Sequence, residues 1–214
     1  MTAQQHKLAT LFKQATIIPV LTIDRLEDAV PLARALVAGG VRVLEVTLRT
    51  SVAIPAATAI MAEVPEAIVG IGTILNAADL ARAEALGAKF GISPGATPDL
   101  LKAAAASALP FAPGTATASE LMQALAHGFD LVKFFPAESS GGIKALRALA
   151  GPFPEVRFCP TGGIGEASAA AWLGEPNVVA VGGSWLCPAA DIRSANWAGI
   201  SAICRRTMNS LKAA

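Results

Sequence analysis

A lysine lies in the middle of a short apolar run, where a charge is costly. Residues 130–136 read Asp-Leu-Val-Lys-Phe-Phe-Pro, with Lys133 at the centre. In a β-strand alternate side chains point to the same side, so Leu131, Lys133 and Phe135 share one face. Burial among apolar groups lowers the pKa of an amine from about 10.4 and yields the free amine that attacks a carbonyl. Lys133 is therefore predicted to form an imine, the alternative being a structural ion pair with a buried carboxylate.

A second charged pattern lies in residues 41–49. Alternation places Leu44, Val46 and Leu48 on the face towards the helices. The opposite face carries Val41, Val43, Glu45, Thr47 and Arg49. Glu45 would lie among apolar neighbours, which favours a general acid/base. Arg49, at the carboxyl end, can hold a substrate carboxylate through two parallel hydrogen bonds. The alternative is a Glu45–Lys133 or Glu45–Arg49 ion pair that orders the core, and such pairing is compatible with catalysis.

Two glycine pairs follow apolar runs near the end of the chain. They are Thr161-Gly162-Gly163 and Gly182-Gly183-Ser184, and a helix is expected to start after each. Glycine lets the backbone approach an anion closely, and the N–H groups of a helix N-terminus favour negative charge. With the hydroxyls of Thr161 and Ser184, these turns predict a phosphate site. The alternative is that the glycines only form turns.

Two further residues are candidates for the same site. Thr73 ends its strand on the same face as Val69 and Ile71, where its hydroxyl could assist Arg49. Pro94 ends another strand and has no N–H donor, so it could only shape the wall of a pocket.

The elements that position these residues form a repeated pattern. Helical stretches alternate with short β-branched runs; several of them end at Gly39, Gly87 or Gly128, and others start at the caps Asn76 and Thr97. The β-branched runs are 17–23, 41–48, 67–74, 88–94, 109–115, 130–136, 156–162 and 177–184.

Eight strand–helix alternations with short connections predict an α/β fold, a (β/α)8 TIM barrel with a short N-terminal helix in residues 1–16. We expect residues 1–214 to form a single domain. An open doubly wound sheet is the alternative, but no GxGxxG motif follows the first strand. In such barrels the chemistry lies at the carboxyl ends of the strands, so Lys89, at an amino end, is expected at the other face.

Composition narrows the function classes. Only 15% of the 214 residues are charged, below the roughly 25% typical of soluble domains, which favours a homo-oligomer. The net charge is +1 and no long basic run is present, so nucleic acid is not an expected partner. No apolar stretch predicts a membrane span or a signal peptide, and the three cysteines lack metal spacing, which together favour reduced thiols in the cytoplasm. With only two histidines, a Ser-His-Asp triad or a multi-His metal site is not expected.

Six stretches resemble the 2-keto-3-deoxy-6-phosphogluconate (KDPG) aldolase family, whose members often also cleave 4-hydroxy-2-oxoglutarate. They are GGVRVLEVTLRT, PEAIVGIGTILN, FGISPG, KFFPAE, VRFCPTGGI and GGSWL, and the similarity weakens before residue 17 and after about residue 186. The resemblance implies a class I (Schiff-base) aldolase that reversibly cleaves KDPG to pyruvate and glyceraldehyde 3-phosphate. It further implies a cytoplasmic homotrimer of the Entner-Doudoroff pathway that needs no metal or other cofactor.

The resemblance also implies a role for each matching residue. Lys133 would be the Schiff-base lysine and Glu45 the proton-transfer residue. The substrate would be held by Arg49 and Thr73 at its carboxylate, by Phe135 and Pro94 at the pocket wall, and by Gly162, Gly163 and Ser184 at its phosphate. Differences at Ile71, Ile74 and Ser139-Ser140 could retune the aldehyde preference. The rival hypothesis is a phosphate-binding barrel without aldolase activity, like thiamin-phosphate synthase or a phosphosugar binder, which would leave Lys133 and Glu45 unexplained.

Overall fold

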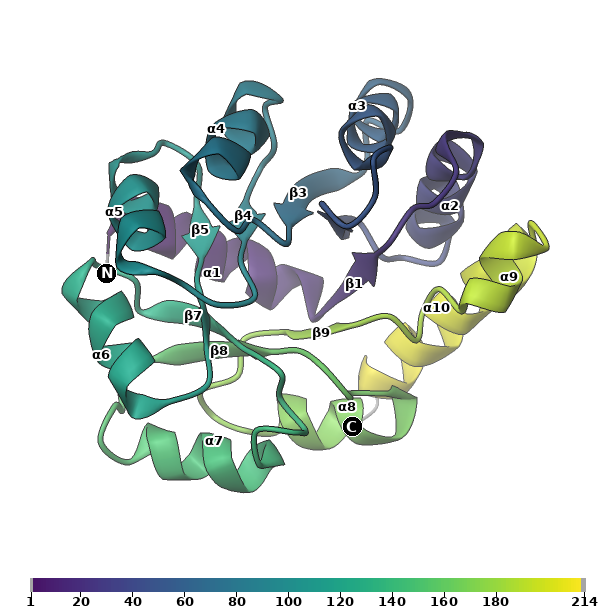
Figure 1. Cartoon of the computed structure of the whole chain (residues 1–214). Coiled ribbons are helices and arrows are strands. Elements are labelled where there is room, and N and C mark those ends of the chain that lie inside the picture. Colours follow the sequence, from purple (N-terminus) through teal and green to yellow (C-terminus); the bar gives the residue numbers. More distant parts are fainter. Residues whose placement is uncertain (1, 213–214) are drawn as a thin grey trace.

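The computed structural model describes residues 2–212, in which strands and helices alternate along the chain (Figure 1). The strands are β1 (Ile17–Leu21), β2 (Val43–Thr47), β3 (Ile68–Gly72), β4 (Gly91–Ile92), β5 (Phe111–Ala112), β6 (Gly114–Thr115), β7 (Leu131–Phe134), β8 (Arg157–Pro160) and β9 (Val181–Gly183). The helices are α1 (Ala3–Ala15), α2 (Leu26–Ala38), α3 (Ala53–Glu63), α4 (Ala77–Ala85), α5 (Pro98–Ala106), α6 (Ala118–Ala126), α7 (Gly142–Ala150), α8 (Glu166–Leu173), α9 (Ala189–Arg193) and α10 (Trp197–Lys212).

The strands close into a ring. Parallel pairing gives the orders β5-β4-β3-β2-β1-β9 and β6-β7-β8. β5 and β6 are two halves of one strand interrupted at Pro113, which has no N–H to donate to the ladder. A parallel bridge between Thr161 and Gly182 joins β8 to β9. Eight strand positions therefore surround a common axis with helices outside them, which confirms the predicted TIM barrel.

Local sequence signals set several helix ends. The side chains of Asn76 and Thr97 each accept a hydrogen bond from the backbone N–H three residues further on, as expected of N-caps. Gly87 and Gly128, which follow α4 and α6, have φ angles of 81° and 87°. Glycine adopts this left-handed conformation readily, and the predicted helix ends are confirmed.

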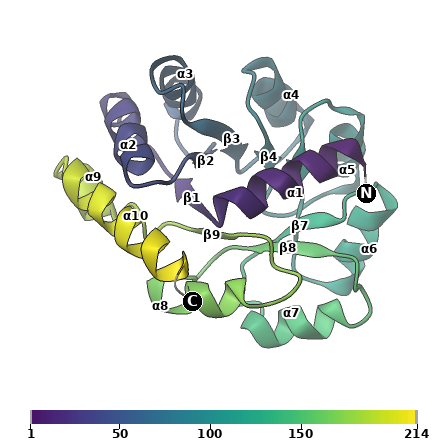
Figure 2. The same ribbon diagram turned by 180° about the vertical axis from the view of Figure 1, so that it is seen from behind.

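Helix α1 closes the amino end of the barrel (Figure 2). Phe12 of α1 packs edge-on against Phe90 inside the barrel, with ring centroids 5.3 Å apart. The buried Gln5 donates a hydrogen bond to the carbonyl of Phe111 (2.8 Å) and accepts one from the N–H of Leu131 (2.9 Å). The expected N-terminal helix is thus present as Ala3–Ala15, while Met1 lies outside the described residues.

The core has an inner and an outer layer. The inner layer fills the barrel and joins α1 to strand residues that include Ile18, Val43, Leu131 and Cys159. The outer layer lies between strands and helices and includes Leu44, Val46, Val132 and Phe134. The faces predicted for Val43 and Leu131 are therefore confirmed. Val41 was wrongly placed with Val43, because it precedes β2 and packs in the outer layer.

The prediction that Thr73, Val69 and Ile71 share the face towards the site was also wrong. Val69 and Ile71 pack in the outer layer, so Gly70 and Gly72 face the interior of the barrel. β3 ends at Gly72, and Thr73 follows it with φ of 60°, which breaks the alternation of side chains. The strands are also shorter than the β-branched runs, because one or both ends of each run lie in loops.

None of the helices within residues 2–212 is long and apolar enough to span a bilayer. Lys89 is exposed just before β4, at the amino end of the barrel where it was expected.

Candidate active site

Lys133 and Glu45 meet inside the barrel. Their strands, β7 and β2, occupy opposite positions in the ring of strands. Lys133 Nζ lies 3.2 Å from Glu45 Oε1, and the two side chains are 5% and 2% exposed. Each ion needs the other in this setting, because an unpaired buried charge is strongly destabilising. The structure thus brings together the predicted nucleophile and the predicted acid/base.

Glycine at position 72 makes room for the Glu45 carboxylate. A Cβ atom on Gly72 would overlap that carboxylate, so any other residue there would displace it. Sequence reasoning missed Gly72, although a glycine within an apolar strand often marks a close approach of another group.

The thiol of Cys159 is the other reactive group beside Lys133. The two residues are partners in the register of β7 and β8, and Cys159 is buried. Burial raises the pKa of the Cys159 thiol to about 12, although the nearby Lys133 acts in the opposite direction. At neutral pH this thiol is protonated, so it does not compete with Lys133 as a nucleophile.

A cavity of about 270 Å³ opens at the carboxyl ends of the strands. Lys133 is not among the described residues that line it, but its Nζ lies 5.3 Å from the centroid of the Phe135 ring, which forms part of the wall. Seven of the predicted residues line this cavity: Arg49, Phe135, Thr161, Gly162, Gly163, Gly183 and Ser184. Val20, Thr22 and Ile164 line it as well and were not predicted.

The first glycine pair forms a turn that packs on the segment after β7. Gly162 and Gly163 have φ angles of 102° and 80°, which favour glycine strongly. The N–H of Glu138 donates to the carbonyl of Gly162 (3.0 Å), and a Cβ on Gly163 would lie 2.7 Å from the Glu138 side chain. The turn is thereby held beside the strand of Lys133, and α8 starts soon after it at Glu166, as expected.

The side chains of Thr161 and Trp185 pack directly against the backbone of the second glycine pair. A Cβ on Gly182 would overlap Thr161, and one on Gly183 would overlap the ring of Trp185. Ser184 is exposed at the cavity, and its carbonyl accepts the N–H of Cys187 (3.0 Å) to form a turn. A helix was expected to start after Ser184, but this turn comes first and α9 begins only at Ala189.

Thr73 and Pro94 are not among the residues of the described chain that line this cavity. Thr73 is half-buried and has a φ angle of 60°, a strained conformation for a β-branched residue that tends to occur at functional sites. The backbone of Pro94 lies against Gly114, whose partner in the strand register is Lys133. Neither residue is therefore part of the wall of this cavity, and Pro94 lies next to the strand of Lys133.

The cavity offers groups that bind anions and hydroxyls. Arg49 supplies a guanidinium, while Thr22, Thr161 and Ser184 supply hydroxyls. Among residues 2–212, His, Cys, Asp and Glu side chains do not form a group of three or more that could hold a metal ion. A buried amine paired with a carboxylate, below a polar cavity of this kind, suits imine chemistry on a small anionic carbonyl compound.

Comparison with known proteins places this geometry in a family. The family model described as KDPG and KHG aldolase matches residues 8–203. The KHG/KDPG aldolase of Escherichia coli (strain K12) is 52% identical over 196 residues, which cover 92% of each chain. A KDPG aldolase from Legionella pneumophila, with pyruvate captured as a covalent carbinolamine intermediate, superposes with a TM-score of 0.91 at 46% identity, covering 93% of this chain and 97% of that one. The KDPG aldolase of Zymomonas mobilis ZM4 with 3-phosphoglycerate gives a TM-score of 0.89 at 46% identity, covering 95% of each.

Proposed function

Because the chain belongs to the KDPG and KHG aldolase family, we propose that it is a class I aldolase that reversibly cleaves KDPG to pyruvate and glyceraldehyde 3-phosphate. Cleavage of 4-hydroxy-2-oxoglutarate to pyruvate and glyoxylate is the second activity of the same site. The contact between Lys133 and Glu45 inside the barrel carries the proposal. A barrel that only bound phosphosugars would have no use for this buried pair.

The reaction begins at Lys133. Its free amine attacks the C2 ketone, and the carbinolamine that forms loses water to give an iminium ion. Glu45, 3.2 Å away, can take the proton of the Lys133 ammonium to free the amine, and it returns this proton to the departing hydroxyl once a proton of the attacking nitrogen has moved to the C2 oxygen. The iminium ion then acts as an electron sink for the next step.

Cleavage follows when Glu45, through a water molecule, takes the proton of the C4 hydroxyl. The C4 oxygen forms the aldehyde carbonyl, the C3–C4 bond breaks, and its electron pair produces an enamine on Lys133. Protonation of the enamine at C3 restores the iminium ion. Its hydrolysis releases pyruvate and the free lysine.

The remaining residues hold the substrate. Arg49, assisted by Thr73, binds the carboxylate next to the ketone, and Phe135 forms the wall at the pyruvyl end. Pro94 shapes that end through its contact with Gly114, the strand partner of Lys133. The phosphate binds to backbone N–H groups and hydroxyls at the other end, a common anion site in this fold. That end consists of Thr161, Gly162, Gly163, Gly183 and Ser184.

The wider context belongs to the same proposal. One domain comprising the whole chain would assemble as a homotrimer in the cytoplasm and act in the Entner-Doudoroff pathway. The low content of charged residues, 15%, supports burial of some outer helices in an oligomer.

The direct test is to incubate the protein with KDPG and follow pyruvate through lactate dehydrogenase. Wild type should release pyruvate, and Lys133→Gln should release none above the uncatalysed rate. The matched control is Lys89→Gln, which removes an exposed lysine at the opposite end of the barrel and should keep full activity. Failure of the wild type with both KDPG and 4-hydroxy-2-oxoglutarate would overturn the proposed function.

A further inference from the structure

Thr22 lies in the cavity, and the proposed mechanism gives it no role. It follows β1, which lies between β9 and β2 in the sheet, with Pro19 opposite Gly183 and Val20 opposite Glu45. Thr22 and Ser184 together line both the cavity described above and a neighbouring one of about 450 Å³. Thr22 is therefore placed between the proposed phosphate site and the strand that carries the acid/base.

The hydrogen bonds around Thr22 fix the direction of its hydroxyl proton. The buried Thr47 donates its only hydroxyl proton to the carbonyl of Leu21, at 2.8 Å. The hydroxyls of Thr22 and Thr47 are 3.3 Å apart, so in this contact Thr22 must be the donor. Among residues 2–212, Thr47 is the partner of the Thr22 hydroxyl, which leaves the lone pairs of Thr22 Oγ1 available to a ligand. Thr22 thus offers the cavity an acceptor, and an acceptor binds a hydroxyl group.

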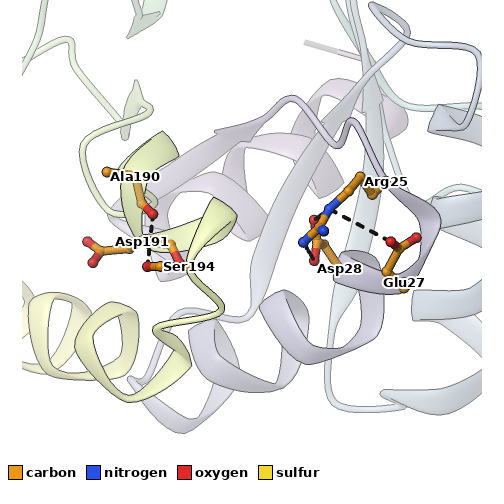
Figure 3. Close-up of polar contacts among 6 residues, drawn as sticks. All are labelled: Arg25, Glu27, Asp28, Ala190, Asp191 and Ser194. Atoms are coloured by element: carbon orange, nitrogen blue, oxygen red, sulfur yellow. Dashed lines mark hydrogen bonds and ion pairs between the residues drawn. The ribbon is translucent and has the colours of Figure 1, made fainter.

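The loop that carries Thr22 is held from both sides. Thr50 donates a hydrogen bond of 2.6 Å to the carbonyl of Ile23. Arg25 forms two hydrogen bonds to Asp28, from Nε (2.8 Å) and Nη2 (2.7 Å), and Figure 3 shows its guanidinium between Asp28 and Glu27. Because the loop is already ordered, binding a ligand there costs little conformational entropy.

We propose that Thr22 accepts a hydrogen bond from the C5 hydroxyl of KDPG and is a specificity-determining residue of the active site. The inference rests on the proposed function. In that reaction the C4 hydroxyl faces Glu45 and the C6 phosphate lies at the glycine turns and Ser184. C5 must then lie between those two groups, where Thr22 is found. In 4-hydroxy-2-oxoglutarate C5 is a carboxylate, so this hydroxyl is absent.

The first test compares kcat/KM for KDPG with kcat/KM for 4-hydroxy-2-oxoglutarate. Thr22→Val keeps the shape of the side chain and removes the acceptor, so the ratio of the two values should fall roughly 3- to 10-fold, the range for one neutral hydrogen bond. Thr22→Ser keeps the hydroxyl and should restore most of the ratio. The control Thr58→Val removes an exposed hydroxyl that bonds only within α3 and should leave the ratio unchanged.

The second test changes the substrate, and its comparison of two aldehydes on the wild type does not depend on how a variant folds. In the condensation direction, the C2 hydroxyl of glyceraldehyde 3-phosphate becomes the C5 hydroxyl of KDPG, and 3-oxopropyl phosphate lacks it. Wild type should favour glyceraldehyde 3-phosphate, and Thr22→Val should narrow that preference roughly 3- to 10-fold. Two outcomes would overturn the role of Thr22 alone. One is that Thr22→Val cleaves KDPG with an unchanged ratio of kcat/KM for the two keto acids. The other is that the wild type shows no preference between the two aldehydes. Loss of cleavage of both keto acids by the wild type would instead overturn the proposed function.

Discussion

Lys133 and Glu45 reach across the barrel from opposite strands, and their charged atoms lie 3.2 Å apart in a nearly closed interior. Such a pair has a high desolvation cost, and removal of one partner from a buried pair typically destabilises a protein by about 3–5 kcal/mol. The sequence left a structural ion pair and catalysis as alternatives for these residues. Their position below a polar cavity makes the two roles compatible, because the same contact can order the core and move a proton.

Replacement of Glu45 should separate proton transfer from imine formation. Glu45→Gln keeps the size of the side chain but removes the base, so kcat for KDPG cleavage should fall by about 10²- to 10⁴-fold. The variant should still form an imine between Lys133 and pyruvate, which borohydride reduces to a stable adduct. Glu63→Gln, at an exposed ion pair with Arg34, is the matched control. Near-normal turnover in Glu45→Gln would show that Glu45 only orders the core.

Ser184 should discriminate between the two proposed substrates. A hydrogen bond to a charged group contributes about 1.5–3 kcal/mol, so Ser184→Ala should lower kcat/KM for KDPG by roughly 10- to 150-fold. Cleavage of 4-hydroxy-2-oxoglutarate, which has no phosphate, should change much less. Ser194→Ala is the control, because that hydroxyl bonds to the carbonyl of Ala190 at the end of α9 (Figure 3). An equal loss of kcat/KM for both substrates would show that Ser184 does not bind the phosphate.

A carboxylate outside the site should contribute to the dependence of stability on pH. Arg147 holds Glu175 through two hydrogen bonds of 2.9 and 2.6 Å and keeps the pKa of that carboxyl below its usual range. A lowered folded-state pKa stabilises the protein above the unfolded value of about 4.3, and the contribution is lost as pH falls through the folded-state pKa. Urea unfolding should therefore find Glu175→Gln less stable than wild type at pH 7, with a difference that shrinks towards pH 3. A difference that stays constant over this range would contradict the assignment.

Periodicity in the sequence was sufficient to place the two charged side chains of the site that lie within strands. The alternation around Lys133 and Glu45 placed both side chains inside the barrel, and their contact confirms it. The N-caps Asn76 and Thr97 could also be predicted, because capping depends on a few neighbouring residues. Capping and side-chain alternation depend on neighbouring residues in the sequence, so these predictions held within regular strands and helices.

Predictions failed where the backbone departs from regular geometry. The face of Thr73 followed from a strand that continued past Gly72, whereas the backbone turns there with a positive φ. The helix expected after Ser184 starts later, because a turn precedes it. Thr22 went unnoticed because its role depends on Thr47, which is distant in sequence and adjacent only once the strands pair. Loop conformation and contacts between strands depend on the whole fold, which is why short patterns did not predict them.

Lys133 is the residue proposed to form the imine, and covalent trapping with pyruvate is the decisive test. The protein is incubated with pyruvate, reduced with borohydride, digested and examined by mass spectrometry, with Lys89 as the internal comparison. We expect a stable pyruvate adduct on the peptide that contains Lys133, with matching loss of aldolase activity. An adduct on Lys89, or on no lysine at all, would contradict it.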